Sequence, residues 1–341
     1  MTETSGSGRR ALVTGATGYI GSRLVPTLLD EGWTVRVLTR DADKLQDRRW
    51  VGRAEVVEGD ATSKTDLADA LADVDVAYYL LHSMDSEGGF VERDREMART
   101  FGLAAFEADV DRIVYLSGLH PDTDGPLSDH LASRVEVGDL LMASGVPTAV
   151  LQAAIILGSG SASFEMLRHL TARLPVMVTP KWLMNRIQPI AVRDVLHYLV
   201  ACAELPADVN RTFDIGGPEV LTYKDMIARF ARIAGMFPRT VLTVPVLTPK
   251  LASRWVGLVT PVPTGLAQPL VESLLHEVVC HEHDIDDLVG GPPGGALGFD
   301  QAVEDAVAGD GADPRPEPGT VDPARVTAAD PSWAGGGQSG S

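Results

Sequence analysis

The residues Thr14-Gly15-Ala16-Thr17-Gly18-Tyr19-Ile20-Gly21 separate two stretches of different hydrophobic periodicity. Residues 10–15 are a short apolar run typical of a buried strand, and apolar residues then recur at helical spacing up to Leu29. Glycines spaced in this way permit a tight strand-to-helix turn whose backbone approaches a pyrophosphate group. We therefore predict a Rossmann phosphate turn formed by Gly15, Thr17, Gly18, Tyr19, Ile20 and Gly21.

The same alternation of strands and helices continues through the first 158 residues. Further strands are expected at residues 34–39, 55–58, 74–81, 112–117 and 147–152, with helices at 66–72, 92–108 and 127–143. Strands and helices that alternate at this pace indicate parallel βαβ units with right-handed crossovers. The predicted fold class is α/β, a Rossmann doubly wound parallel sheet with a smaller C-terminal substrate lobe.

The composition and the alternation of predicted strands and helices divide the chain into four regions. Residues 1–9 are expected to be a disordered N-terminus, and residues 10–158 an NAD(P)-binding Rossmann domain. Residues 159–307 are expected to form the substrate lobe, with segments that return to the Rossmann sheet. Residues 308–341 are rich in Gly, Pro, Asp and Ala with few apolar residues, which indicates a disordered acidic tail.

Charge and cysteine content restrict the partners and the compartment. With 47 acidic and 29 basic residues, the net charge of −18 argues against nucleic acid, and equally against an anionic membrane surface, as the main partner. The two cysteines are too few for a disulfide framework. No secretory signal is visible, and the apolar stretch 241–262 is interrupted by proline and charged residues. We expect a cytoplasmic protein without an integral membrane span and without a metal site.

The end of the second strand bears on which dinucleotide is bound. Arg40 follows Thr39 about twenty residues after the glycines, where the residue that contacts the ribose is expected. A guanidinium suits a 2′-phosphate, so NADP(H) is preferred, while NAD(H) stays possible because Asp41 could itself reach the ribose. Asp60, after the third strand, suits either the adenine edge or a cap of the next helix.

Several further motifs carry a family resemblance over about residues 10–300. They are Leu80-Leu81-His82-Ser83-Met84, Ser128-Asp129-His130-Leu131-x-x-Arg134, Gly158-Ser159-Gly160-Ser161-Ala162-x-Phe164-Glu165, Pro189-Ile190-x-Val192-x-Asp194 and Gly216-Gly217-Pro218-Glu219. The chain resembles the atypical extended short-chain dehydrogenases/reductases, in the NmrA-like branch, and is similar to the bacterial YbjT-type NAD(P)H-binding proteins. This branch mixes reductases with cofactor-sensing and scaffolding proteins. The resemblance implies a cofactor site that includes Leu81, His82, Ser117 and Arg134.

The sequence departs from this superfamily where its catalytic residues are expected. Catalytic members pair a Tyr with a Lys four residues later on one helical face, and none of the six tyrosines here has Lys at that offset. The corresponding helix carries His130 and Arg134 instead. One hypothesis makes His130 the proton donor and Arg134 the residue that holds the ribose. The other makes both ordinary surface residues of a domain that has lost the chemistry.

Two more residues are candidates for catalysis. His82 follows the fourth strand, at the carboxyl edge where ligands bind in open parallel sheets, but it could equally be a loop histidine bonded to backbone. Ser117 occupies the family's catalytic-serine position, and a serine beside Gly118 is also ordinary turn chemistry.

The substrate can be predicted only as a class. Phe164, Met166, Met177, Trp182 and Met184 fall where relatives line the pocket over the nicotinamide, which favours an apolar substrate. We predict an NADP(H)-dependent oxidoreductase acting on a small apolar carbonyl, enone or quinone-like molecule. The alternative is a non-catalytic NAD(P)H-sensing or assembly protein with a protein partner, and a homo-oligomer also stays possible. The absent Tyr–Lys pair disfavours a nucleotide-sugar epimerase.

Overall fold

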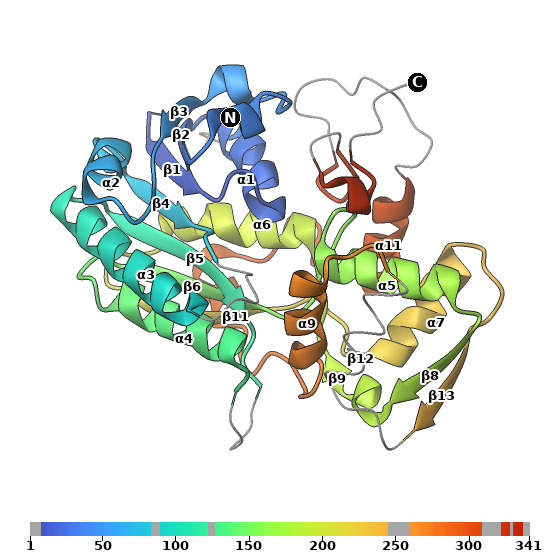
Figure 1. Cartoon of the computed structure of the whole chain (residues 1–341). Coiled ribbons are helices and arrows are strands. Elements are labelled where there is room, and N and C mark those ends of the chain that lie inside the picture. Colours follow the sequence, from blue (N-terminus) through green and yellow to red (C-terminus); the bar gives the residue numbers. More distant parts are fainter. Residues whose placement is uncertain are drawn as a thin grey trace.

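A single parallel sheet organises the chain (Figure 1). The computed structural model describes residues 8–82, 89–121, 127–244, 260–308, 322–327 and 330–336. The sheet has seven strands in the order β11-β6-β5-β4-β1-β2-β3, and all its neighbouring strands are parallel. The strands are β1 (Arg10–Thr14), β2 (Thr34–Thr39), β3 (Glu55–Glu58), β4 (Val76–Tyr79), β5 (Arg112–Gly118), β6 (Thr148–Ala153) and β11 (Arg211–Ile215). The predicted Rossmann α/β fold is confirmed.

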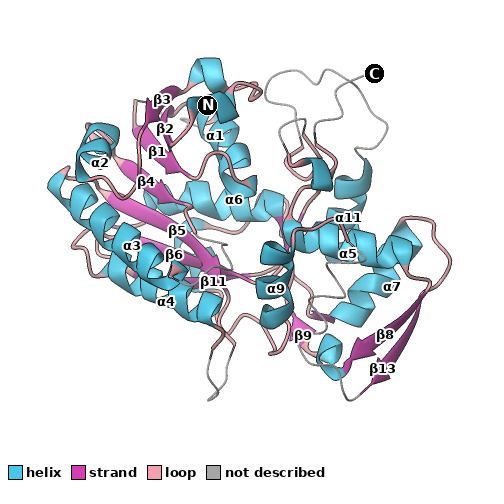
Figure 2. Ribbon diagram, in the orientation of Figure 1, coloured by secondary structure: helices cyan, strands magenta, loops and turns pink. Residues whose placement is uncertain are grey.

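Helices cover both faces of this sheet (Figure 2), which explains why its central strands are apolar on both sides. On one face, α1 (Tyr19–Asp30) and α6 (Val192–Ala201) pack on alternate residues of β1 and β2. On the other face lie α2 (Lys64–Leu71), α3 (Phe90–Glu107) and α4 (Asp129–Met142). The short 3-10 helices η1 (Ala42–Leu45) and η2 (Val51–Arg53) connect β2 to β3.

The smaller lobe is built from short strands and helices that leave the main sheet after β6. Three two-stranded sheets pair β10 with β7, β12 with β9 and β13 with β8. Its elements are β7 (Ile156–Leu157), α5 (Ala162–Arg173), β8 (Val176–Pro180), η3 (Lys181–Met184), β9 (Arg186–Ile187), β10 (Ile190–Ala191), β12 (Leu221–Thr222), α7 (Tyr223–Ile233), β13 (Thr240–Val244), α9 (Thr264–Ser273) and α11 (Phe299–Val307). Two further elements, η4 (Cys202–Glu204) and α10 (Asp284–Val289), lie against β5 and β11 of the main sheet. None of the helices in the described ranges is both long and apolar enough to cross a membrane.

Parts of both chain ends pack on the folded body. The expectation of a disordered tail over 308–341 is wrong for residues 322–327 and 330–336, which include η6 (Ser332–Ala334). Asp330 forms an ion pair with Arg23 of α1 at 2.8 Å, and their side chains are only 2% and 4% exposed. At the other end, Arg9 donates a 2.8 Å hydrogen bond to Glu204, whereas residues 1–7 lie outside the described part of the chain.

Candidate functional site

The phosphate turn has the geometry that its glycines predict. Gly15 has a φ of +71°, and a Cβ atom there would lie 2.5 Å from the carbonyl oxygen of Leu80. A Cβ atom on Gly21 would lie 2.3 Å from the carbonyl oxygen of Gly15. The Gly18 N–H donates to that same Gly15 oxygen at 2.9 Å. Only glycine therefore fits at positions 15 and 21.

The helix that follows the turn offers its amino end to an anion. Gly18 is the N-cap of α1 and supplies no capping side chain, and the first turn of the helix carries no acidic residue. Thr17 and Gly18 are exposed, and Tyr19 and Ile20 are half-buried. The first N–H groups and the positive end of the helix dipole thus suit the pyrophosphate of a dinucleotide. Arg48, which no sequence motif marks, donates to the Thr17 carbonyl at 3.2 Å and adds a cation beside the turn.

At the end of β2, Arg40 is exposed while its acidic neighbour is engaged elsewhere. The Asp41 carboxylate accepts a 3.1 Å hydrogen bond from the Asp43 N–H and lies 3.6 Å from Lys44 Nζ. Asp60 accepts hydrogen bonds of 2.8 Å from both the N–H and the hydroxyl of Thr62, and these bonds lower the pKa of Asp60. The Asp60 carboxylate therefore stabilises the turn that follows β3.

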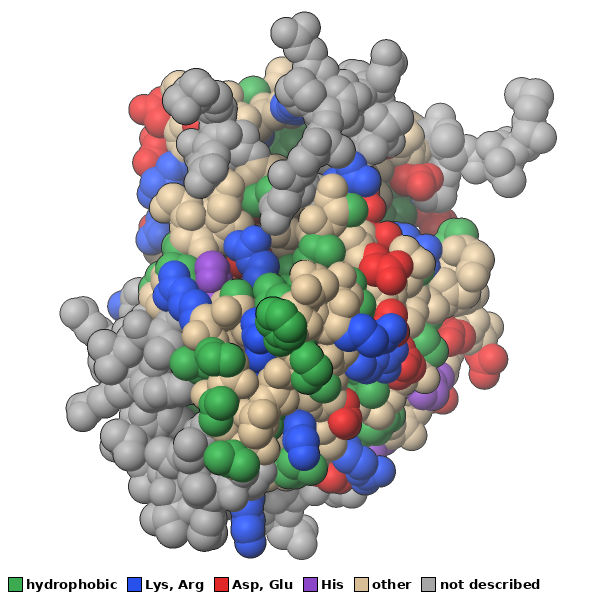
Figure 3. Space-filling model, turned by 90° about the vertical axis from the view of Figure 1, so that its right-hand side faces the viewer, with side chains coloured by type: hydrophobic (Ala, Val, Ile, Leu, Met, Phe, Trp, Pro, Cys, Tyr) green, Lys and Arg blue, Asp and Glu red, His purple; other side chains and the backbone are tan. Residues whose placement is uncertain are grey.

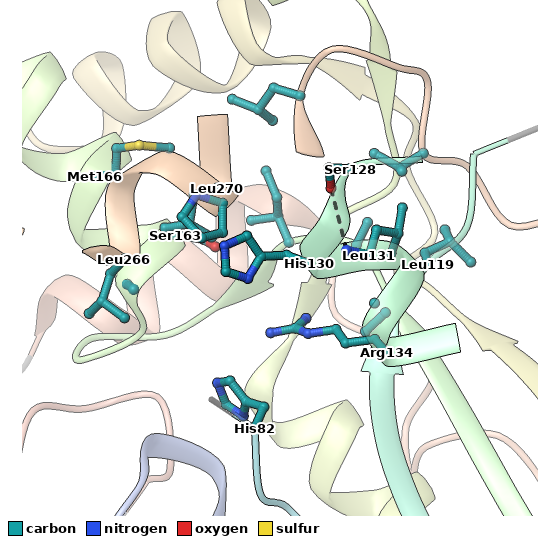
Figure 4. A pocket seen from close by; sticks show the side chains of 18 of the residues that line it. His82, Leu119, Ser128, His130, Leu131, Arg134, Ser163, Met166, Leu266 and Leu270 are labelled. Carbon is teal, nitrogen blue, oxygen red and sulfur yellow. Dashed lines mark hydrogen bonds between the residues drawn. The ribbon is translucent and has the colours of Figure 1, made fainter. Parts of the chain in front are cut away.

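A cavity lies beyond the carboxyl ends of β4 and β5, bordered by α4, α5 and α9 (Figure 4). Its polar side chains are grouped where His82, His130 and Arg134 point into it, with Asp94 and Ser128 nearby. The remaining wall is mainly apolar. It includes Phe90, Leu119, Leu131, Ile155, Met166, Leu266, Pro269, Leu270, Leu274 and Val278.

Helix α4 sets the positions of two of these polar residues. Ser128 caps it by accepting a 3.3 Å hydrogen bond from the Leu131 N–H. Residues four apart lie on the same helical face, so His130 and Arg134 enter the cavity together. His82 reaches the same space from the end of β4 (Figure 4). The structure thus brings His82 together with the pair of His130 and Arg134, which the sequence places on a different element.

The surroundings of the cavity lower the pKa of both of its imidazoles. His130 stacks on Phe90 with ring centroids 4.4 Å apart, and burial is the main cause that lowers the pKa of His130. Burial among the surrounding groups, followed by the charges of Arg134 and His130, also lowers the pKa of His82. His82 is exposed to solvent at the end of β4.

Other expected residues do not line the cavity. Ser117 is 4% exposed within β5, and its neighbour Gly118 forms that part of the wall. Leu81 is half-buried beside His82 without being part of the lining. Of the five residues expected over the nicotinamide, Met166 lines the cavity. Phe164 and Met177 are buried in the core, Met184 is exposed, and the side chain of Trp182 lies outside the described residues.

The sequence analysis missed the apolar wall supplied by α9. Leu266 and Leu270 are four residues apart on that helix and both face the cavity. No motif marks this segment, although its helical spacing of leucines is a usable signal. Phe90 and Asp94, at the start of α3, show the same four-residue spacing and were also missed.

Comparisons with known proteins agree with the turn and the fold. Residues 15–154 match the family model of NAD(P)H-binding domains. A ceramide reductase from Caulobacter vibrioides is 28% identical over 238 residues, covering 67% of this chain and 72% of that protein. A 3-beta-hydroxysteroid dehydrogenase from Mycolicibacterium neoaurum is 32% identical, but the match covers only 31% of each chain.

A solved structure extends the likeness over most of the chain. The NADPH-dependent quinone oxidoreductase from Escherichia coli, complexed with NADPH, superposes with a TM-score of 0.65 at 21% identity. The match covers 86% of this chain and 98% of that one. Residues 15–154 are thus similar to NAD(P)H-binding domains, and the chain shares the Rossmann-type fold of that solved structure.

Proposed function

We propose that this Rossmann protein is an atypical short-chain dehydrogenase/reductase that uses NADP(H) to reduce an apolar carbonyl, enone or quinone-like substrate. The observation that carries the proposal is the convergence of His82, His130 and Arg134 in one cavity with an otherwise apolar wall. Leu80 packs on Gly15, and His82 follows two residues later, so the cavity adjoins the phosphate turn. The ceramide reductase and the quinone oxidoreductase named above support a reductase of an apolar molecule.

In this proposal, different residues bind the ligands and transfer the proton. Bound NADPH would supply a hydride. The Arg134 guanidinium, half-buried in the cavity, provides fixed N–H donors for the ribose hydroxyls or for a substrate oxygen that becomes negatively charged. The α9 wall holds the apolar part of the substrate and excludes water from the reacting end.

His130 is the better of the two candidates for the proton donor. Its charged neighbours include Glu272, whose carboxylate opposes the fall in the pKa of His130. The charges near His82 come from Arg134 and His130, and both lower its pKa further. The His82 imidazole therefore stays neutral and acts in our scheme as a hydrogen-bond donor or acceptor, while His130 delivers the proton.

The preference for NADP(H) rests on Arg40. Its side chain is exposed at the end of β2, where the 2′ position of the ribose is expected. Asp41, the residue that would instead accept from a 2′-hydroxyl, is already engaged by the Asp43 N–H and by Lys44.

The decisive experiment replaces His130 and measures NADPH oxidation with a panel of apolar ketones, enones and quinones. In His130→Ala, kcat should fall by about 10²- to 10⁴-fold, the usual contribution of a positioned proton donor, while NADPH binds as in the wild type. His197→Ala is the control, because His197 contacts the Gly290 carbonyl in the lobe and does not line the cavity. An active enzyme with unchanged kcat in His130→Ala would show that the assignment is wrong.

The missing Tyr–Lys pair motivates a second candidate, a cofactor sensor without turnover. In that case the wild-type protein binds NADPH but reduces nothing in the panel. A protein partner captured only in the presence of NADPH would then favour the sensor over the reductase.

A further inference from the structure

The two-stranded sheet of β8 and β13 lies at the outer end of the lobe, away from the Rossmann sheet (Figure 1). The strands are parallel, with Val176 opposite Thr240 and Met177 opposite Val241. Met177 faces inward and is 1% exposed, whereas Val176 and Leu242 are 55% and 52% exposed. Because side chains alternate between the two faces of a strand, the outer face of this sheet presents apolar groups to solvent.

Phe237 extends this apolar surface. It precedes β13 by three residues and is 88% exposed, the highest value among the exposed large hydrophobic side chains of the described residues. Its loop lies beside the start of β8, because the Thr240 N–H donates to the Pro175 carbonyl at 3.0 Å. We call Val176, Phe237 and Leu242 the ribbon face. An exposed apolar patch of this kind usually marks an interaction site.

The segments that build the ribbon face carry cations and no acidic residues. Residues 170–184 and 235–244 contain Arg173, Lys181 and Arg239 but neither Asp nor Glu, in a chain with 47 acidic residues. Arg173 and Lys181 are exposed. Arg239 donates to the Thr171 carbonyl at 2.7 Å and to the Phe237 carbonyl at 3.0 Å, so it supports the loop that presents Phe237.

Figure 3, which faces this side of the molecule, shows hydrophobic side chains with Lys and Arg between them, and Asp and Glu mainly toward the right of the view. The net charge of −18 argues against an anionic membrane surface as the main partner. The net charge of the whole chain does not describe the charge of one part of its surface. Binding to a surface depends mainly on the charges that lie nearest the contact.

We propose that the ribbon face docks peripherally on an anionic lipid bilayer. Its apolar side chains would enter the interfacial region while Arg173 and Lys181 meet the anionic headgroups. An anionic bilayer fits better than a second copy of this chain, because two ribbon faces in contact would bring like cations together. The proposal is independent of the reductase assignment.

Sedimentation of the full-length protein with lipid vesicles tests this docking. The protein should pellet with vesicles of equal phosphatidylcholine and phosphatidylglycerol, pellet much less with phosphatidylcholine alone, and be released by high salt. The double variant Phe237→Asp, Leu242→Asp should lower the partition coefficient by at least about tenfold, because it removes the inserted groups and adds two negative charges. Lys181→Glu should lower it by roughly fivefold or more, since each basic residue near the surface contributes about that factor.

Matched controls separate docking from unfolding and from self-association. Leu103→Asp, Phe106→Asp makes the same chemical change on α3, where these side chains are 44% and 54% exposed, and should leave vesicle binding unchanged. Circular dichroism checks the fold of every variant, and the salt series on the wild-type protein tests the proposal without any substitution. The proposal fails if the wild-type protein stays in the supernatant with anionic vesicles, or if the α3 control binds as poorly as the ribbon variant. It also fails if the ribbon variant only converts a dimer into a monomer.

Discussion

The buried ion pair between Arg23 and Asp330 makes a quantitative prediction about the C-terminal segment. Arg23 Nη1 and Nη2 reach the two Asp330 oxygens at 2.9 and 2.8 Å, in a bidentate arrangement. The two side chains are 4% and 2% exposed. Removal of one partner from such a pair leaves an uncompensated buried charge, which typically costs about 3–5 kcal/mol of unfolding free energy.

Asp330→Asn is the appropriate perturbation, since it keeps the shape and removes the negative charge. Arg23 also donates to the carbonyls of Pro323, Ser159 and Arg325 at 2.8, 2.9 and 3.0 Å. These hydrogen bonds remain in the variant and still partner part of the guanidinium. We therefore expect the free energy of unfolding to fall by about 3 kcal/mol, near the lower end of the range.

Urea unfolding followed by circular dichroism measures this loss as a lower midpoint at unchanged slope. Glu204→Gln is the matched control, because it removes the exposed partner of Arg9 at the same 2.8 Å separation. An exposed pair of that kind contributes about 0–1 kcal/mol. If Asp330→Asn destabilises the protein no more than Glu204→Gln does, the C-terminal segment is not anchored as we describe.

Two further predictions concern the reductase. In the proposed reductase, protonated His130 donates the proton, and its pKa lies below the ordinary 6.5. We therefore expect kcat/KM for carbonyl reduction to rise as pH falls from 8 through the pKa of His130. A pH profile that rises toward alkaline pH would contradict this role. Calorimetry should show that Arg40→Ala weakens NADPH binding by about tenfold or more and leaves NADH binding within a factor of a few. Arg53→Ala, at another exposed arginine, is the control. An equal loss of affinity for both dinucleotides would refute a contact with the 2′-phosphate.

Local sequence signals were sufficient for the Rossmann half of the structure. The bounds of β2 and β3 agree with the prediction because turn residues or a change of hydrophobic pattern mark both ends of each strand. The joint placement of His130 and Arg134 follows from helical geometry alone. β4 is shorter than expected, Val76–Tyr79 rather than residues 74–81, because the apolar run continues into the loop that carries Leu81 and His82.

Contacts between distant parts of the chain were not predictable in the same way. The α9 wall is built more than 120 residues after α4, and the pairing of Arg23 with Asp330 spans 307 residues. The composition of residues 308–341 indicates disorder because it contains few apolar groups to bury. Residues 322–327 and 330–336 are instead held by contacts with distant parts of the chain, such as the Arg23–Asp330 ion pair and the 2.7 Å hydrogen bond from the Ser159 N–H to the Ala324 carbonyl. Hydrophobic periodicity does not reveal contacts of this kind.

The replacement of Tyr and Lys by His130 and Arg134 changes what the neighbouring cation does. A cation lowers the pKa of a tyrosine toward neutrality, where an acid–base catalyst works best. The same cation moves a histidine pKa away from neutrality, and Arg134 does lower the pKa of His130. The carboxylates of Glu272, Asp129 and Asp94 act in the opposite direction and raise it. In a reductase built on this pair, these acidic neighbours take on the tuning role that the lysine has in the Tyr–Lys arrangement, and α9, which carries Glu272, contributes to catalysis as well as to the apolar wall.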